Sequence, residues 1–205
     1  MTGKPLFRVF AEQILAANRK YGVTIPWYVM TSPLNDADTR AFFRDNNWFG
    51  LEQRNVFLFP QGTMPSITPD GKLLLEEKDT LAVNPDGHGG ALRALRSSGA
   101  IEDMLARGIT QLSYFQVDNP LVNVIDPTFL GLHASHPDSS GEMSSKMVAK
   151  RDAGEKVGVF CRERTTHGGR TRVLEYSDLP PAVGQATDPD GSLRFRAGSI
   201  AIHVL

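Results

Sequence analysis

The N-terminal third of the chain alternates between helical and extended patterns, and this alternation limits the possible folds more than any other feature. Apolar residues first recur at the spacing of one helix face and stop at Gly22. The successive patterns are a helix over 4–22, a strand over 23–32, a helix over 35–51 and a strand over 55–62. Strands that alternate with helices predict a mainly parallel sheet with helices packed on it.

Strand-like runs dominate the second half of the chain. A hairpin is expected over 66–78, around the turn Pro69-Asp70-Gly71. Helices are expected over 89–98, 100–108 and 126–136, and strands over 109–122, 144–152, 155–165, 171–179 and 192–205. The whole chain therefore predicts an α/β fold in which a mainly parallel sheet carries an antiparallel addition.

Composition narrows the class of protein. A chain of 205 residues, 40% of them hydrophobic, can bury one good core. The formal net charge of −1 gives no signature of a nucleic-acid or membrane-surface partner, and no apolar run approaches the ~20 residues of a membrane span. The single cysteine, Cys161, lies in an apolar run, which indicates a core residue and a reducing compartment, so we expect a cytoplasmic protein.

A glycine-rich stretch, "NPDGHGGALRAL" over 84–95, comes just before one of the expected helices. Glycines let backbone amides approach a ligand at positive φ, and a helix N-terminus attracts phosphate. His88 would then donate a hydrogen bond to a phosphate or sugar oxygen. The other interpretation is a tight loop with an exposed histidine, and the stretch by itself does not decide between the two.

Two further polar residues follow expected strands, at the edge where open α/β sheets bind ligands. Gln61 carries an amide that both donates and accepts, as the reading of a nucleobase edge requires, or it is a polar turn residue. Asp118 is placed to hold Mg²⁺ beside substrate phosphates, or it caps the turn that Asn119-Pro120 favours.

Several short blocks, taken in order, resemble the eukaryotic-type UDP-sugar pyrophosphorylases, a family of uridylyltransferases. The blocks are "IPWYVMTS", "FLFPQGTMPSITPDGKLLLEEK", "NPDGHGGALRAL", "FQVDNPLVNVIDPTFLG", "EKVGVFCRE", "VLEYSDLP" and "FRAGSIAIH". Many blocks in one order are far more specific than one glycine loop. Within the family they are most similar to the UDP-N-acetylglucosamine pyrophosphorylases.

The resemblance implies a Rossmann-like, GT-A-like nucleotidyltransferase sheet, mixed but mostly parallel, with helices on both faces. It also implies that UTP and a sugar 1-phosphate, with N-acetylglucosamine 1-phosphate favoured, give the UDP-sugar and pyrophosphate. The sugar phosphate attacks the α-phosphorus of UTP directly. Catalysis then needs positioning and charge neutralisation by Mg²⁺ rather than a protein nucleophile.

By the same resemblance, Gln61 and the backbone of Gly87 contact uracil, and His88 lies near the sugar or its phosphate. Asp118 is implied as the catalytic ligand of the Mg²⁺ that bridges the phosphates. The UDP-N-acetylglucosamine enzymes have asparagine where this chain has His88. The Gly-His-Gly form is more similar to the UDP-glucose and broad UDP-sugar enzymes, which therefore stay an alternative.

On the sugar side, Gly158 and Glu175 are implied to hydrogen-bond the sugar hydroxyls. Ser199 stands where the family pattern "AGNIANH" has a sugar-binding asparagine, and Ile202 replaces the second asparagine of that pattern. Serine is the shorter side chain, so Ser199 loses a sugar contact or needs a bridging water.

The family's GxGTRxG loop and a C-terminal phosphate-binding lysine are not among these 205 residues. We therefore expect residues 1–205 to be the central part of a nucleotidyltransferase catalytic domain, weak or inactive by itself, through a fragment or a misassigned start. Two other interpretations stay open. One is a non-catalytic module that binds sugar nucleotides, and the other is a GT-A-like glycosyltransferase, whose Asp-x-Asp would correspond to Val117-Asp118-Asn119.

Overall fold

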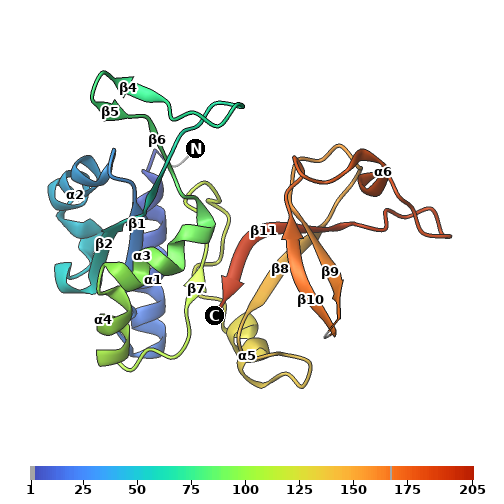
Figure 1. The fold of residues 1–205 in the computed structure, drawn as a ribbon. Helices are drawn as coiled ribbons and strands as arrows, with labels where there is room; N and C mark the ends of the chain where they lie inside the picture. Colours follow the sequence, from blue (N-terminus) through green and yellow to red (C-terminus); the bar gives the residue numbers. More distant parts are fainter. Residues whose placement is uncertain (1–2, 167) are drawn as a thin grey trace. The chain divides into compact units, whose positions relative to one another are not determined.

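The computed structural model describes residues 3–166 and 168–205. The chain divides into two compact units, Met1–Thr110 and Gln111–Leu205. Figure 1 shows that most of the helical structure belongs to the first unit and most of the longer strands to the second.

The first unit is built on a parallel pair of strands. Strand β1 (Trp27–Thr31) pairs with β2 (Val56–Pro60) in continuous register. The α-helices of this unit are α1 (Leu6–Tyr21), α2 (Asp36–Asp45), α3 (Ala91–Ser97) and α4 (Ala100–Ala106). Three single turns, η1 (Asn47–Gly50), η2 (Gln53–Asn55) and η3 (His88–Gly90), complete its helical structure.

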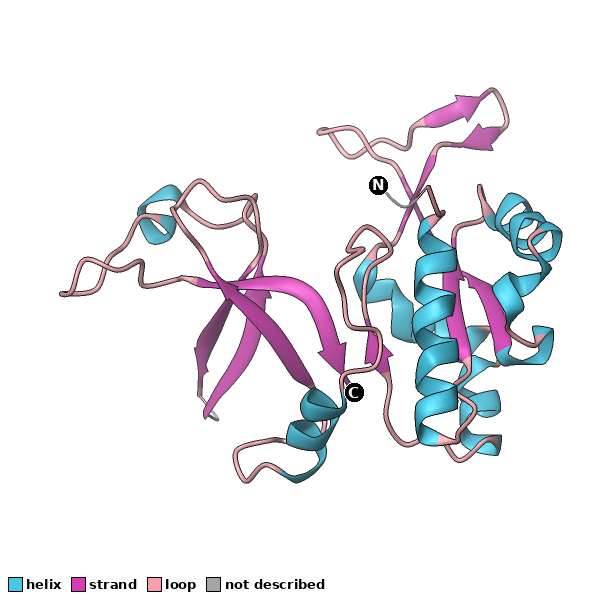
Figure 2. Ribbon diagram, turned by 180° about the vertical axis from the view of Figure 1, so that it is seen from behind, coloured by secondary structure: helices cyan, strands magenta, loops and turns pink. Residues whose placement is uncertain are grey.

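Helices cover both faces of this strand pair (Figure 2). Successive side chains of a strand point to opposite faces. The ring of Trp27 lies 5.9 Å from Phe7 of α1 and 5.5 Å from Phe43 of α2, between ring centroids. The next residue, Tyr28, donates a 2.6 Å hydrogen bond to Asp103 of α4. Helices α1 and α2 therefore pack on the Trp27 side of the pair, and α4 packs on the Tyr28 side.

The second expected helix is shorter than the sequence pattern predicts. The pattern extends over 35–51, whereas α2 ends at Asp45. Asn47, Trp48 and Phe49 have φ values of 48°, 51° and 54°, a left-handed conformation that ends a right-handed helix. Phe49 is nevertheless buried against Phe43, at 5.2 Å between ring centroids. Aromatic packing, which helix periodicity alone does not reveal, sets this boundary.

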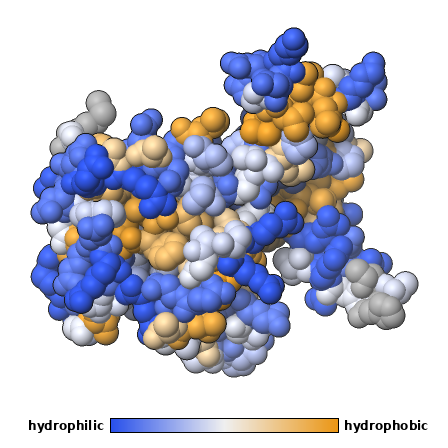
Figure 3. Space-filling model, turned by 60° about the vertical axis from the view of Figure 1, so that its left-hand side comes forward, coloured by the Kyte–Doolittle hydropathy of each residue, from blue (hydrophilic) through white to orange (hydrophobic). Residues whose placement is uncertain are grey.

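A long hairpin extends from the first unit (Figure 1). It pairs β3 (Thr63–Pro65) with β6 (Val83–Pro85), and β4 (Leu75–Glu77) with β5 (Thr80–Leu81). Its large apolar side chains are exposed: Met64, Ile67, Leu73, Leu74, Leu75, Leu81 and Val83. A hydrophobic area is visible at the top of Figure 3. The sequence predicts only its outer part, over 66–78.

The second unit is an antiparallel sheet with strand order β10-β9-β11-β7, in which β8 also pairs with β11. Its elements are β7 (Ser113–Tyr114), α5 (Pro127–Ser135), β8 (Ser144–Ala149), β9 (Val159–Thr165), β10 (Gly168–Leu174), α6 (Pro181–Gly184) and β11 (Ala197–Val204). Val159 and Val204 are fully buried in its core. The pairing of β8 with β11 is irregular between Ser199 and His203, where Ala201 has φ 50°.

The fold is mixed α/β, but the mostly parallel sheet is not confirmed. Among the described residues, β1–β2 is the one parallel pair, and the other strand pairs are antiparallel. The strand expected over 109–122 is reduced to the two residues of β7, which pair with Val204 and His203 of β11. Asp118 consequently does not end a buried strand.

No helix in the described part of the chain combines the length and the apolar character needed to cross a membrane.

Candidate functional site

The first candidate site lies at the carboxyl edge of the parallel pair. Thr31 and Pro60 are the last paired residues of β1 and β2. The backbone amide of Gln61 donates a 2.8 Å hydrogen bond to the carbonyl of Thr31, so the residue after β2 is tied to the end of β1. Gln61 is half-buried. The backbone of Gln61 is thus held at the edge where open α/β sheets bind ligands.

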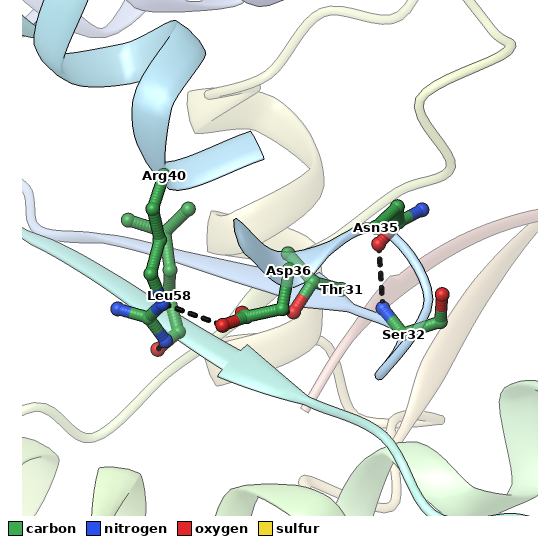
Figure 4. Close-up of polar contacts among 6 residues, drawn as sticks. All are labelled: Thr31, Ser32, Asn35, Asp36, Arg40 and Leu58. Carbon is green, nitrogen blue, oxygen red and sulfur yellow. Dashed lines mark hydrogen bonds and ion pairs between the residues drawn. The ribbon is translucent and has the colours of Figure 1, made fainter. Parts of the chain in front are cut away.

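A polar cluster fixes this edge (Figure 4). Thr31, which is buried, donates a 2.6 Å hydrogen bond to Asp36, and Arg40 donates a second one of 2.6 Å to the same carboxylate. Arg40 also donates to the carbonyl of Leu58 at 2.7 Å, which links α2 to β2. Hydrogen bonding by Arg40, and secondarily by Thr31, lowers the pKa of Asp36, so this carboxylate stays ionised. The cluster holds the strand end that carries Gln61.

The glycine-rich stretch forms the loop that its sequence predicts. Gly87 has φ 71° and ψ −163°, a conformation that glycine alone adopts easily. The amide of Gly90 donates to the carbonyl of Gly87 at 3.1 Å, which closes the single turn η3 before α3. Gly87 and His88 are exposed. The expected helix over 89–98 is divided between this turn and the seven residues of α3.

Asp86 joins this loop to Gln61. Its amide donates a 3.0 Å hydrogen bond to the carbonyl of Gly62. A Cβ at Gly62 would lie 2.5 Å from a carboxylate oxygen of Asp86, and a Cβ at Gly90 would lie 2.0 Å from the other oxygen. Asp86 is not a sequence-predicted site residue, because a Pro-Asp-Gly tripeptide normally indicates only a turn. The structure therefore brings Gln61, Gly87 and His88 together on connected segments.

A second group lies in the second unit. Ser199 donates its backbone amide to the carbonyl of Gly158 at 2.7 Å. A Cβ at Gly158 would lie 2.8 Å from Val173 and 3.2 Å from the carboxylate of Glu175. Gly158 is buried, Ser199 is half-buried and Glu175 is exposed. The three residues that the resemblance places on the sugar side thus lie side by side.

Ile202 and Cys161, which the sequence also singles out, do not belong to either group of candidate site residues. Ile202, which departs from the family pattern, is only 7% exposed and belongs to the core, so its side chain does not alter the surface beside Ser199. Cys161 is a free cysteine and is only partly buried, although the sequence indicates a core residue.

Asp118 lies in an exposed turn rather than at a strand end. The amide of Asn119 donates to the carbonyl of Gln116 at 3.2 Å, which is the local turn that Asn119-Pro120 favours. No group of three or more potential metal-binding side chains occurs among the described residues. Asp118 therefore offers a single accessible carboxylate. It belongs to the second unit, whereas Gln61, Gly87 and His88 belong to the first.

Comparison with known proteins decides the family. The sequence profile described as "UTP–glucose-1-phosphate uridylyltransferase" matches residues 2–204. The chain belongs to this uridylyltransferase family. UDP-N-acetylglucosamine diphosphorylase 2 of Arabidopsis thaliana is 40% identical over 215 residues, which cover 99% of this chain and 42% of the relative. UDP-N-acetylglucosamine pyrophosphorylase of Saccharomyces cerevisiae is 37% identical over 204 residues, covering 98% and 41%.

Solved structures agree with this assignment. The uridine diphosphate N-acetylglucosamine pyrophosphorylase of Trypanosoma brucei matches 100% of this chain and 41% of its own, with a TM-score of 0.79 at 28% identity. The UDP-glucose phosphorylase of the same organism has a TM-score of 0.77 at 16% identity, which shows the shared fold alone. The uridylyltransferase family member described here spans about two fifths of the length of the curated relatives it matches.

Proposed function

We propose that this chain carries the uridine- and sugar-binding surfaces of a uridylyltransferase that makes a UDP-sugar from UTP and a sugar 1-phosphate. The observation that carries the proposal is the identity of 37–40% over nearly the whole chain to enzymes named for UDP-N-acetylglucosamine. N-acetylglucosamine 1-phosphate is the favoured sugar substrate. The single cysteine supports a place in the cytoplasm.

The proposed roles follow the two groups of residues. Gln61 and the backbone of Gly87 bind uracil, because an amide side chain and a backbone amide can together match its alternating donors and acceptors. His88 lies near the sugar or its phosphate. Gly158 and Glu175 bind the sugar hydroxyls, and Ser199 lies beside them.

The reaction needs no protein nucleophile. An oxygen of the sugar phosphate forms a bond to the α-phosphorus of UTP, and the bond from that phosphorus to the oxygen of the leaving pyrophosphate breaks. Residues that hold the two substrates in line therefore supply the catalysis.

Asp118 is the proposed ligand of Mg²⁺. Magnesium in phosphoryl-transfer sites is held by one or two carboxylates together with substrate phosphates and water, rather than by an all-protein cage. The single exposed carboxylate of Asp118 fits that donor set. When bound, the ion would neutralise charge on the phosphates.

A second sugar remains a candidate because of one residue. His88 stands where the UDP-N-acetylglucosamine enzymes have asparagine, and the Gly-His-Gly form is similar to enzymes for UDP-glucose or for several UDP-sugars. Exchanging His88→Asn and comparing glucose 1-phosphate with N-acetylglucosamine 1-phosphate separates these candidates.

The test combines binding with turnover. Calorimetry measures binding of UTP and UDP-N-acetylglucosamine, and a pyrophosphate-release assay measures turnover with UTP, Mg²⁺ and either sugar 1-phosphate. We expect saturable binding with weak turnover that Asp118→Ala abolishes and Asp138→Ala, an exposed control, does not. Binding without any turnover in a longer chain that carries the GxGTRxG loop would favour a non-catalytic module, and no binding of either nucleotide would contradict the proposal.

A further inference from the structure

The tripeptide Pro-Asp-Gly occurs three times in this chain, at 69–71, 85–87 and 189–191. In each copy the glycine has a positive φ, with values of 82°, 71° and 82° in chain order. The three copies thus share their residues and their glycine conformation. They provide an internal comparison for the aspartate.

Two of the copies are ordinary turns in which the aspartate is satisfied locally. Asp70 accepts a hydrogen bond from the hydroxyl of Thr68 and pairs with Lys72 at 2.9 Å. Asp190 accepts the backbone amide and the hydroxyl of Ser192 at 2.9 and 2.7 Å. Each of these turns also closes a short antiparallel bridge. Here the carboxylate stabilises its own turn.

The copy at 85–87 uses its carboxylate differently. Within the described part of the chain, Oδ1 of Asp86 is the one buried side-chain oxygen or nitrogen without a hydrogen-bond partner. A buried polar atom without a partner lowers stability. The carboxylate of Asp86 instead fills the space above two glycines, Gly62 and Gly90, where a Cβ on either residue would collide with its oxygens.

Those two glycines lie in the segments proposed to bind the nucleotide. Gly62 follows Gln61 directly, and Gly90 closes the turn that begins after Gly87. The side chain of Asp86 therefore touches both segments at once, while its own amide bonds to the carbonyl of Gly62 at 3.0 Å. One side chain sets the separation between them.

We propose that Asp86 is a positioning residue of the nucleotide site, which wedges the Gln61–Gly62 segment against the Gly87–Gly90 loop and so presents both to the uracil of a uridine nucleotide. The identity of this ligand rests on the proposed function. The wedge itself is a property of the fold and can be measured without a ligand. Because Oδ1 of Asp86 is buried without a hydrogen-bond partner, this positioning role lowers the stability of the fold.

The test compares three variants of the 205-residue chain. Asp86→Ala removes the side chain that contacts Gly62 and Gly90, and Asp86→Asn keeps the shape of that side chain. Asp70→Ala removes the aspartate from the Pro-Asp-Gly tripeptide at 69–71. We measure the melting temperature, the amide hydrogen exchange of residues 86 and 90 by NMR, and the dissociation constant of UTP.

For Asp86→Ala we expect a melting temperature at or above that of the wild type, exchange of both amides at least tenfold faster, and UTP binding at least tenfold weaker. Asp86→Asn should stay within threefold of the wild type in exchange and binding, and Asp70→Ala should leave both unchanged. Unchanged exchange in Asp86→Ala would overturn the proposal, as would a lower melting temperature with unchanged UTP affinity. If the wild type does not bind UTP, the proposed function fails, and the exchange rates alone decide the wedge.

Discussion

The backbone amide of Ser199 donates a 2.7 Å hydrogen bond to the carbonyl of Gly158, and this bond ties the start of β11 to the segment that leads into β9. Glu175, which follows β10, also lies close to Gly158, because a Cβ at Gly158 would be 3.2 Å from its carboxylate. Residues that are distant in sequence thus form one surface on neighbouring strands. The arrangement makes the side chain of Ser199 a direct test of sugar recognition.

Lengthening that side chain should strengthen sugar binding. Ser199→Asn restores the asparagine of the family pattern and adds a reach that serine lacks, without disturbing the backbone bond to Gly158. A new hydrogen bond of about 0.5–1.5 kcal/mol corresponds to roughly two- to tenfold tighter binding of UDP-N-acetylglucosamine, measured by calorimetry. Ser199→Ala serves as the control and should change the affinity less than about threefold. Weaker binding by Ser199→Asn would count against the proposed role.

The contact between Asp86 and Gly90 predicts that Gly90→Ala changes the free energy of unfolding in opposite directions in the wild type and in Asp86→Ala. Gly90 has φ −74° and ψ −17°, which alanine adopts without strain, so the carboxylate of Asp86 is the obstacle to a side chain there. Gly90→Ala should therefore destabilise the wild type by about 1–3 kcal/mol. In the Asp86→Ala background, the same change should stabilise by about 0.4–1 kcal/mol, because alanine restricts the unfolded chain. Urea unfolding of the four chains measures both values, and equal effects in the two backgrounds would refute the contact.

A pH-dependent part of the stability comes from Asp103. It accepts hydrogen bonds from Tyr28 at 2.6 Å and from Arg107 at 2.8 Å. The bond from Tyr28, and secondarily that from Arg107, lowers the pKa of Asp103 in the folded state. Since the folded pKa lies below the unfolded value of about 3.9, this stabilisation is present above that pH and is lost as the pH falls through the folded pKa.

Replacing the carboxylate of Asp103 tests whether this stabilisation is lost as the pH falls. Asp103→Asn should lower the free energy of unfolding at pH 7 by about 1–2 kcal/mol, and should lower it less at pH 3. Urea titrations at the two pH values measure the difference. Asp79→Asn, at an exposed position of the hairpin, is the control and should follow the wild type at both. A loss that is equal at pH 7 and pH 3 would show that ionisation of Asp103 contributes nothing.

Local patterns in the sequence predict the elements that local interactions determine. Helix α1 ends where its apolar stripe and Gly22 predict, because glycine there takes φ 65° and its amide caps the carbonyl of Asn18 at 2.9 Å. Strands β1 and β2 are predicted because their residues are apolar and β-rich. The succession of strands in the second half predicts an antiparallel addition, and the second unit has antiparallel pairs. Strand direction is not local, which is why the order of elements did not show that only one described pair would be parallel.

In the candidate site, too, features set by local sequence could be predicted and features set by contacts between segments could not. The glycine loop around Gly87 and the group of Gly158, Glu175 and Ser199 follow from motifs that lie within short blocks. The role of Asp86 could not be predicted from a motif, because its contacts to Gly62 and Gly90 depend on how two segments meet. Its tripeptide also has the same sequence as the tripeptides of two ordinary turns. Asp118 was expected after a buried strand, but β7 ends at Tyr114 and Asp118 lies in an exposed turn.

Sugar-nucleotide binding is tested most directly by a calorimetric titration of the 205-residue chain with UDP-N-acetylglucosamine, in the wild type and in Gly158→Ala. A Cβ at Gly158 would lie 2.8 Å from Val173 and 3.2 Å from the carboxylate of Glu175, so the variant should displace both side chains. Gly131→Ala is the matched control, because this glycine is helical and, apart from its chain neighbours and the backbone of its own helix, no atom lies within 4 Å of the added Cβ. We expect saturable binding by the wild type and the control, weakened at least tenfold in Gly158→Ala. Absence of saturable binding by the wild type, or equal affinity in Gly158→Ala, would contradict the proposed sugar-nucleotide site.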